Sequence, residues 1–244
     1  MIERAVADDA HHAAGLIGRL DPASGEIREY RLPPAAGDPH TLIFREGILW
    51  FTAQQSNLVG RLDPASGDVK IFPVKTPRAL PYGLANAPGG IWVVLFGTSE
   101  LAHVVPASGE IHEIPLPAAD ARPRRLAVDG QGRIWYADFG RSKLGMLDPR
   151  SKTFREFPTP DDGSRPYGMA IGPDGRIWYD ESSKGRIVAF DPATEKSELL
   201  EIPTGGAIVR NMAVDDRRGR IWLALSGTAR LGRIDVDAKR SAVH

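Results

Sequence analysis

Five tryptophans recur along the chain at intervals of 42 to 44 residues, and they are its only tryptophans. They are Trp50, Trp92, Trp135, Trp178 and Trp222. A second marker recurs in phase with them, at Asp21-Pro22, Asp63-Pro64, Val105-Pro106, Asp148-Pro149, Asp191-Pro192 and Asp235-Val236. Two markers with one period establish an internal repeat. Because the repeat contains short β-type runs separated by Gly, Pro and Asp, and lacks long runs with a 3.6-residue period, it predicts the blades of a β-propeller.

Each repeat divides into four short predicted strands. In the repeat at 123–158, RRLAV is expected to be the innermost strand, RIWYA the second, KLGML the third and FREFP the outer edge. Dipeptides such as Asp129-Gly130 and Ser66-Gly67 supply the hairpin turns. Alternation along the second strand places its Trp on a face that packs between neighbouring blades, so we expect the tryptophans to be core residues.

We therefore predict an all-β protein, a β-propeller of four-stranded antiparallel blades forming a single domain over 1–244. The blades are expected at about 14–33, 38–75, 80–117, 122–158, 165–203 and 208–244. We count about six blades. The first is incomplete, although residues 2–8 can add a weak strand to it, and the last shows three clear strands. A five-bladed closure and an open ring are alternatives, and unpaired strand edges leave the oligomeric state open.

Composition excludes several classes of function. Lys plus Arg and Asp plus Glu both total 31, so there is no basic excess that predicts nucleic-acid binding. The absence of cysteine removes disulfides, cysteine metal ligands and a thiol nucleophile. No apolar run approaches the ~20 residues that span a bilayer, and the N-terminus lacks a secretion signal. We therefore expect no membrane association and, if that N-terminus is genuine, a cytoplasmic location.

Two sets of equivalent positions are candidates for a ligand pocket, because the loops before the innermost strands of a propeller surround one end of its channel. The position after the loop proline, or its equivalent, holds His40, Tyr82, Arg124, Tyr167 and Arg210. The third residue after each Trp is Ala53, Leu95, Asp138, Glu181 or Leu225. Residue type changes from repeat to repeat in both sets, which favours a pocket, with solvated and freely varying residues as the alternative.

These positions suggest particular chemical roles. We expect the substrate-binding residues to be Tyr82, Arg124, Tyr167 and Arg210, with the arginines suited to a carboxylate or phosphate. His40, two residues after Asp38, is a candidate general base. The carboxylates of Asp138 and Glu181, from successive blades, can hold Mg²⁺ through oxygen ligands. Arginines offer an alternative that needs no metal, because Arg124, Arg165 or Arg210 can neutralise the same carboxylates.

The repeat, in which PYG precedes an Ile-Trp core and GRLDP precedes Ser-Gly, resembles that of the virginiamycin B lyase (streptogramin lyase) family over nearly the whole chain. The resemblance implies a seven-bladed relative and a Mg²⁺-dependent carbon–oxygen lyase, which confers antibiotic resistance by opening a cyclic depsipeptide, a streptogramin B, through elimination at its ester. It also implies a histidine base in a Glu-Pro-His triplet. The segment Asp38-Pro39-His40 matches that triplet, so His40 is the expected catalytic residue and Asp38, with Asp138 and Glu181, an expected metal ligand.

Two features depart from the family pattern. Ala53 stands where the family's glutamate would follow the Trp, and the counterpart of a second family histidine would fall before Met1. The nearest analogues of that second triplet are Arg122-Pro123-Arg124 and Arg165-Pro166-Tyr167. Three hypotheses follow: a lyase, a non-catalytic propeller that binds a small molecule or cyclic peptide, and, last, a lactonase-like metal hydrolase. Metal-dependent turnover distinguishes the first from the second.

Overall fold

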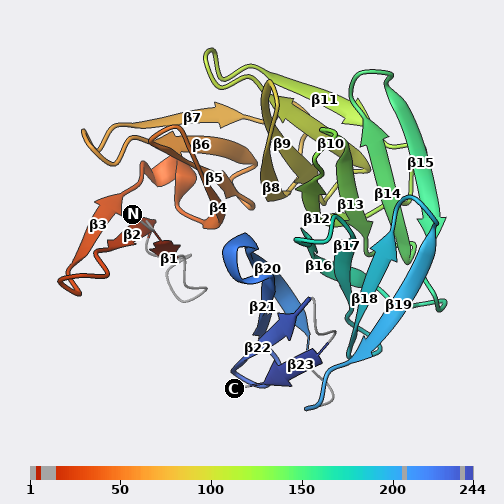
Figure 1. Ribbon diagram of the computed structural model, residues 1–244. Coiled ribbons are helices and arrows are strands. Elements are labelled where there is room, and N and C mark those ends of the chain that lie inside the picture. Colours follow the sequence, from red (N-terminus) through yellow and green to blue (C-terminus); the bar gives the residue numbers. More distant parts are fainter. Residues whose placement is uncertain (1–3, 7–14, 205–207, 237–239, 244) are drawn as a thin grey trace. The chain divides into compact units, whose positions relative to one another are not determined.

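The computed structural model describes residues 4–6, 15–204, 208–236 and 240–243. Its described residues form twenty-three strands in six antiparallel sheets, five with four strands and one with three (Figure 1). This confirms the predicted fold class, an all-β β-propeller with about six blades of which the first is incomplete. The chain divides into two compact units, Met1–Leu116 and Pro117–His244, which are described separately. The single domain over 1–244 stays a prediction.

The first unit contains three sheets. The incomplete sheet comprises β1 (Arg4–Val6), β2 (Leu16–Leu20) and β3 (Ile27–Arg31), so the extra strand expected within 2–8 is present. The second sheet comprises β4 (Pro39–Arg45), β5 (Ile48–Ala53), β6 (Leu58–Leu62) and β7 (Val69–Pro73). The third comprises β8 (Pro81–Ala87), β9 (Gly90–Leu95), β10 (Glu100–Val104) and β11 (Ile111–Pro115). A 3₁₀ turn, η2 (Pro34–Ala36), precedes β4.

The second unit contains three four-stranded sheets. The first comprises β12 (Pro123–Val128), β13 (Ile134–Asp138), β14 (Lys143–Asp148) and β15 (Thr153–Pro158). The second comprises β16 (Pro166–Ile171), β17 (Ile177–Glu181), β18 (Arg186–Asp191) and β19 (Lys196–Glu201). The third comprises β20 (Val209–Asp215), β21 (Arg220–Leu225), β22 (Arg230–Asp235) and β23 (Arg240–Val243), with η3 (Asp216–Arg218) before β21. The last repeat therefore has four strands, where its sequence showed only three clearly.

The repeated Asp-Pro dipeptide marks a side-chain-capped turn after the third strand. Each aspartate accepts a hydrogen bond from the backbone N–H two residues later, at Asp21, Asp63, Asp148 and Asp191, with N···O distances of 2.8 to 2.9 Å. Such a side-chain hydrogen bond mimics a backbone turn and adds to the backbone hydrogen bonds that reverse the chain here. The second marker of the repeat is therefore explained by local chemistry at the hairpin between the third and fourth strands.

A glycine in the third strand faces a large ring from the second strand in two of the sheets. Gly60 is paired with Phe51, and Gly145 is paired with Tyr136. A Cβ on either glycine would lie 2.2 Å or less from a ring carbon, so only glycine leaves room for the ring. Both rings are fully buried, and this accounts for the glycine in the repeated segment before the Asp-Pro turn.

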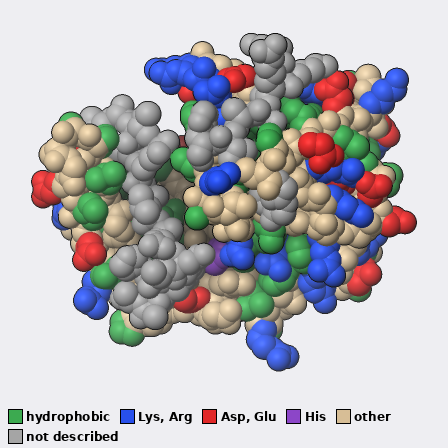
Figure 2. Space-filling view, turned by 90° about the horizontal axis from the view of Figure 1, so that it is seen from below, with side chains coloured by type: hydrophobic (Ala, Val, Ile, Leu, Met, Phe, Trp, Pro, Cys, Tyr) green, Lys and Arg blue, Asp and Glu red, His purple; other side chains and the backbone are tan. Residues whose placement is uncertain are grey.

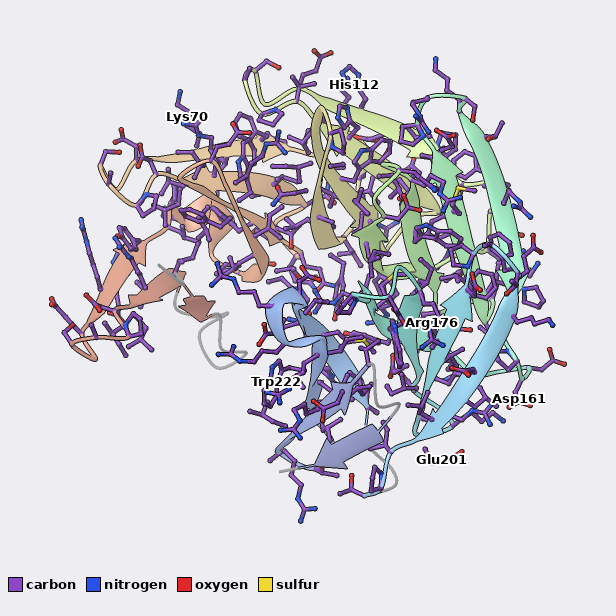
Figure 3. The ribbon with its side chains drawn as sticks, viewed as in Figure 1. Lys70, His112, Asp161, Arg176, Glu201 and Trp222 are labelled. Carbon is purple, nitrogen blue, oxygen red and sulfur yellow. The ribbon has the colours of Figure 1, made fainter. Side chains whose placement is uncertain are left out.

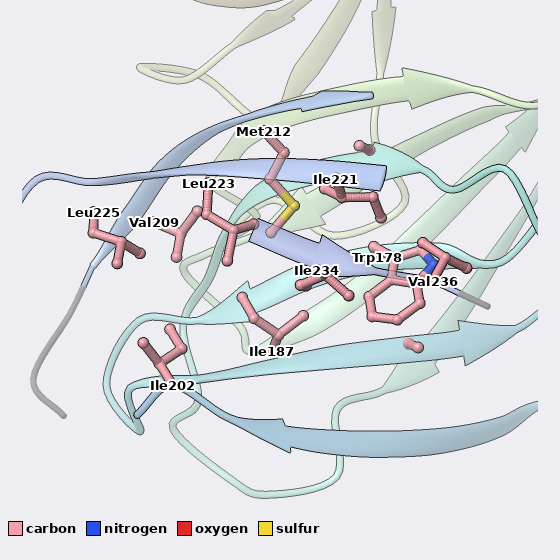
Figure 4. Close-up of a cluster of buried hydrophobic side chains, with 12 residues drawn as sticks. Trp178, Ile187, Ile202, Val209, Met212, Ile221, Leu223, Leu225, Ile234 and Val236 are labelled. Carbon is pink, nitrogen blue, oxygen red and sulfur yellow. The ribbon is translucent and has the colours of Figure 1, made fainter. Parts of the chain in front are cut away.

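Tryptophans of the second strand pack successive sheets together within each unit, as Trp50, Trp135 and Trp178 do. Trp50, Trp92, Trp135 and Trp178 are at most 5% exposed, which confirms the prediction that they are core residues. Figure 4 shows the cluster around Trp178, in which side chains of the β16–β19 sheet meet those of the next sheet, including Val209, Met212, Ile221, Leu223 and Ile234. Trp222 is an exception and is only half-buried.

Trp222 differs because of its place in the series of sheets. It lies on β21 in the last sheet (Figure 3), on the face opposite the one that packs against Trp178. Its cross-strand neighbours are the exposed Ala213 and the half-buried Arg233. No later sheet of the same unit lies in the described part of the chain, so this face lacks the cover that the other tryptophans receive.

Candidate ligand site

Each complete sheet has a register shift at the start of its innermost strand. The first paired residue of that strand lies opposite the third residue after the Trp, in the pairs Pro39 with Ala53, Pro81 with Leu95, Pro123 with Asp138, Pro166 with Glu181 and Val209 with Leu225. A β-bulge follows at once, and these bulges contain the predicted base, His40, and the four residues predicted to bind substrate. Bulges re-aim side chains and often occur beside binding sites.

In the first unit the bulges bring His40 and Tyr82 together. Their ring centroids are 4.0 Å apart, and the Tyr82 ring also lies 5.8 Å from that of Phe96. His40 Nδ1 lies 2.9 Å from Thr41 Oγ1, which fixes the orientation of the imidazole. The result is a row of three aromatic rings from two neighbouring sheets.

Thr52 fixes the backbone of both bulges in this unit. Its buried hydroxyl donates to the carbonyl of Tyr82 at 2.8 Å and accepts from the N–H of Thr41 at 3.2 Å. This one side chain, two residues after Trp50, therefore joins the β4–β7 sheet to the β8–β11 sheet. The positions of the His40 and Tyr82 rings depend on this hydrogen-bonded connection.

Asp38 does not act on the imidazole in this arrangement. Its carboxylate accepts hydrogen bonds from the backbone N–H groups of Gln55 and Ser56 and from the Ser56 hydroxyl. It thereby closes the turn between β5 and β6. The Asp-Pro-His segment is thus a structural anchor at its first residue, whereas its histidine lies among aromatic rings.

The second unit brings Arg124 and Tyr167 together around Phe139. The guanidinium carbon of Arg124 lies 4.6 Å from the ring centroid of Phe139 and 5.1 Å from that of Tyr167. The two rings meet edge to face at 6.1 Å. A second guanidinium, that of Arg165, lies 5.6 Å from the Phe139 ring. Phe139, the residue after β13, was not predicted, although an aromatic residue also follows β9 at Phe96.

Asp138 is buried beneath the start of β12. Its carboxylate accepts from the N–H of Arg122 at 2.9 Å and from the N–H of Arg141 at 3.3 Å. The Arg141 guanidinium lies 3.5 Å from its other oxygen and also binds Glu156. Burial raises the pKa of Asp138, while these donors act in the opposite direction. The neutralising arginine is Arg141, and not one of the arginines expected from the sequence.

Glu181 has a comparable environment in the next sheet. Its side chain is fully buried, and one oxygen accepts from Arg186 Nε at 2.5 Å. Arg186 also binds Asp161, in the loop before β16 (Figure 3). The second oxygen, Oε1, has no hydrogen-bond partner among the described residues. Arg186 lies directly across the β17–β18 hairpin from Glu181, so the pairing follows from the hairpin's length.

Asp180 has a structural role that the sequence did not reveal. It accepts from the N–H groups of Tyr167 at 2.9 Å, Gly168 at 2.7 Å and Val209 at 3.2 Å, and from the Ser182 hydroxyl at 2.7 Å. Burial raises the pKa of Asp180 to about 7. Like Thr52, it is the second residue after a Trp, so a polar residue at that position was the available signal.

Arg210 is not joined to the other predicted site residues. It lies in the bulge of β20 and its side chain is exposed. Over the described ranges, no ion pair or ring contact links it to Arg124 or Tyr167. Its proposed part in ligand binding therefore stays a prediction from the repeat alone.

Each carboxylate considered for Mg²⁺ is already engaged by donors of its own unit. The oxygens of Asp38 are used by the β5–β6 turn, and those of Asp138 and Glu181 face arginines of their own sheets. Within residues 4–6, 15–204, 208–236 and 240–243, no group of three or more His, Asp or Glu side chains could hold a metal ion. Glu181 Oε1 is an unused acceptor, but it is a single buried oxygen beside a guanidinium.

Several comparisons with known proteins agree on one family. The sequence profile of the virginiamycin B lyase family matches residues 10–154, more than half of the chain. The chain is similar to selenomethionine-substituted virginiamycin B lyase from Staphylococcus aureus, with 24% identity and a TM-score of 0.87, covering 96% of this chain and 78% of that one. It is similar to a streptogramin B lyase structure with 26% identity and a TM-score of 0.86, covering 96% of this chain and 76% of that one.

A third solved structure contains a ligand. It is a catalytically inactive histidine-to-alanine variant of virginiamycin B lyase from Staphylococcus aureus with quinupristin. Its identity to this chain is 22% and its TM-score is 0.88, covering 98% of this chain and 82% of that one. No curated protein is significantly similar in sequence.

None of the helices in the described ranges has the length and apolar character needed to cross a bilayer.

Proposed function

Because the chain belongs to the virginiamycin B lyase family, we propose that it binds a small, cyclic peptide-like ligand at the bulged strand starts of its first unit. The observation that carries this proposal is the aromatic cluster at those bulges, which brings together His40, Tyr82 and Phe96. Aromatic side chains give a large contact area at low conformational cost, which suits an amphipathic peptide ring.

Quinupristin is the appropriate first probe, because it accompanies a related structure of the family. We expect the purified chain to bind it, as measured by isothermal titration calorimetry. Tyr82→Leu removes the central ring of the first cluster and should raise the dissociation constant about tenfold, since truncating a central aromatic contact costs about 1 to 2 kcal/mol.

Tyr30→Leu is the matched control for Tyr82→Leu. Tyr30 is 6% exposed and Tyr82 is 5% exposed, but Tyr30 lies on β3 and its hydroxyl donates to the Pro64 carbonyl. This variant should bind quinupristin as the wild type does. Equal losses in the two variants, or no wild-type binding at about 1 mM quinupristin, would contradict the proposal.

The second candidate function is carbon–oxygen lyase activity with His40 as general base. The observation that favours it is the position of the imidazole, which is oriented by Thr41 in a bulge and packs on Tyr82. In the elimination, the base takes a proton from the carbon next to the one bearing the ester oxygen. A C=C bond forms, the C–O bond breaks, and the ester leaves as a carboxylate.

Mass spectrometry of quinupristin incubated with the chain tests this candidate. Elimination gives a linear product of unchanged mass, whereas hydrolysis adds one water. We expect His40→Ala to lower the rate of elimination at least 100-fold, because a positioned base contributes roughly 10² to 10⁴ in rate. Parallel incubations with Mg²⁺ and with a chelator test the family's metal requirement. Unchanged turnover in His40→Ala would remove this residue from the mechanism.

A further inference from the structure

Two tryptophans of the second unit donate their indole N–H to an aspartate. Trp135 Nε1 donates to Asp129 at 2.8 Å, and Trp178 Nε1 donates to Asp174 at 3.0 Å. Both aspartates lie in the turn between the first and second strands of their sheet. Each also accepts from the Nε of an arginine in the same turn, at 2.6 and 2.5 Å. In both sheets, therefore, one carboxylate joins an indole N–H to a guanidinium.

Trp50 has the equivalent position in the β4–β7 sheet but lacks such an acceptor. Its ring stacks on that of Phe72 with centroids 5.9 Å apart, and the ring of Trp135 stacks on that of Phe157 at 5.5 Å. Trp50 is only 2% exposed, yet its indole N–H has no hydrogen-bond partner among the described residues. A buried tryptophan usually finds a partner for this group.

The turn beside Trp50 has the opposite charge. Arg45 ends β4 and pairs across the β4–β5 hairpin with Ile48. In the β12–β15 sheet the corresponding place is that of Asp129, whose N–H donates to the Arg133 carbonyl. A guanidinium therefore stands in this sheet where the carboxylate stands in the other.

A pocket of about 420 Å³ lies beside this turn and is lined by residues of the β4–β7 and β8–β11 sheets. Strand register places Arg45, Trp50 and Arg61 on one face of the first of these sheets, and all three line the pocket. Val105 and Pro106, in the turn after β10, give it an apolar wall on the other side. Two cations and an indole ring thus face an apolar surface.

Positive charge exceeds negative charge in this pocket. Arg45 Nη1 donates to the carbonyls of Ala87 at 3.2 Å and Gly90 at 3.5 Å, and Nη2 lies 3.2 Å from Glu46. Glu46 is the one acid among the described residues that line the pocket, and its side chain is 80% exposed. Over the described part of the chain, Arg61 forms no ion pair. The single carboxylate is therefore largely in water, while one guanidinium has no acidic partner.

We infer that this pocket binds a small ligand through a carboxylate, which takes the place that Asp129 and Asp174 have in the other sheets. One carboxylate oxygen accepts from the Trp50 indole N–H, and the other pairs with the Arg61 guanidinium through a charge-assisted hydrogen bond. The ligand's apolar or aromatic part packs on the apolar wall. The ligand class is thus a small carboxylate with an apolar body.

This pocket and the site of the proposed function lie at opposite ends of β4. His40 is in the bulge between Pro39 and Leu42, whereas Arg45 is the last residue of the strand. Five residues of strand span about 15 Å, so one small ligand does not occupy both places. The pocket is therefore a second site, which does not depend on the proposed function.

Benzoate, benzamide and acetate test both parts of the ligand by NMR titration of the full chain at low salt. Benzoate has the carboxylate and the ring, benzamide lacks the charge, and acetate lacks the ring. We expect benzoate to bind about tenfold more tightly than the other two, and to shift the Trp50 indole N–H signal, which is identified by its absence in Trp50→Phe. Equal binding of either other probe, or an unshifted Trp50 signal at about 10 mM benzoate, would overturn the inference.

Arg61→Gln should weaken benzoate binding about tenfold, because one charge-assisted contact is lost. Arg233→Gln is the matched control. Arg233 is also half-buried and lies directly opposite a tryptophan, Trp222, on the third strand of its sheet, but it pairs with Asp235 at 3.0 Å. It changes the net charge equally and should leave benzoate binding unchanged. Equal losses in the two variants would contradict a site at Arg61. The titration of the wild type with the three probes decides the matter if Arg61→Gln does not fold.

Benzoate and quinupristin should respond to different substitutions. Tyr82→Leu should leave benzoate binding at wild-type strength, and Arg61→Gln should leave quinupristin binding at wild-type strength. Benzoate binding that persists when quinupristin does not bind at all supports the pocket and removes only the cyclic peptide-like ligand. A loss of both ligands in either variant would mean one shared site and would remove the separate pocket.

Discussion

At the scale of single residues, the buried carboxylate of Asp180 shows how this molecule joins its sheets. Four donors from β16, β20 and Ser182 converge on it, and its burial nevertheless raises its pKa to about 7. In the unfolded chain an aspartate titrates near 3.9. Folding therefore favours the protonated form. The stability gained from Asp180 is fully present below about pH 4 and is lost as the pH rises to about 7.

Asp180→Asn tests this pH dependence. Asparagine cannot ionise, but its NH₂ group would face the N–H of Val209, so the variant should be less stable than the wild type at pH 5. As the pH rises from 5 to 8, the wild type should lose its advantage by up to about 3 kcal/mol, because each pKa unit corresponds to about 1.4 kcal/mol. Urea unfolding of both proteins at several pH values measures the difference. Parallel stability curves would contradict the raised pKa.

At the scale of elements, the sequence predicts the strands better than it predicts what their ends do. The repeat period and the hairpin dipeptides identify four-stranded sheets, since both depend on local chemistry. A proline precedes the bulge in four of the five complete sheets, but the register shift itself is a property of strand pairing, which the proline alone does not predict. His40 and Tyr82 were nevertheless identified. They occupy equivalent positions whose residue type changes from repeat to repeat, whereas the Trp is the same in every repeat.

The carboxylates at the strand ends show why part of the site was not predicted. Asp138 and Glu181 were expected at an open channel mouth, but they are 1% and 0% exposed. Their arginine partners come from the turn and third strand that follow, at Arg141 and Arg186. The pairing of Glu181 with Arg186 could have been predicted from the register of the β17–β18 hairpin. The contact of Phe139 with two arginines could not, because it joins residues from two sheets.

At the scale of the whole molecule, the formal net charge is zero, and Figure 2 shows basic and acidic side chains interspersed with hydrophobic ones on the face it displays. This face therefore lacks the one-signed charge typical of nucleic-acid binding. Ligand binding is therefore expected to depend on local features, such as the contacts of Arg124 with the rings of Phe139 and Tyr167. Its stability depends on a series of similar sheets, each of which is stabilised by its neighbours.

This dependence on neighbours predicts unequal costs for equivalent substitutions. Trp178 is fully buried between two sheets, whereas Trp222 is half-buried on the last one. Trp178→Ala should lower the free energy of unfolding by about 3 to 5 kcal/mol, because it leaves a large cavity. Trp222 buries less of its surface on folding than Trp178 does. Trp222→Ala should therefore lower the free energy of unfolding by less than about half as much. Urea unfolding of the two variants measures both values, and equal losses would mean that the Trp222 face is covered as fully as the others.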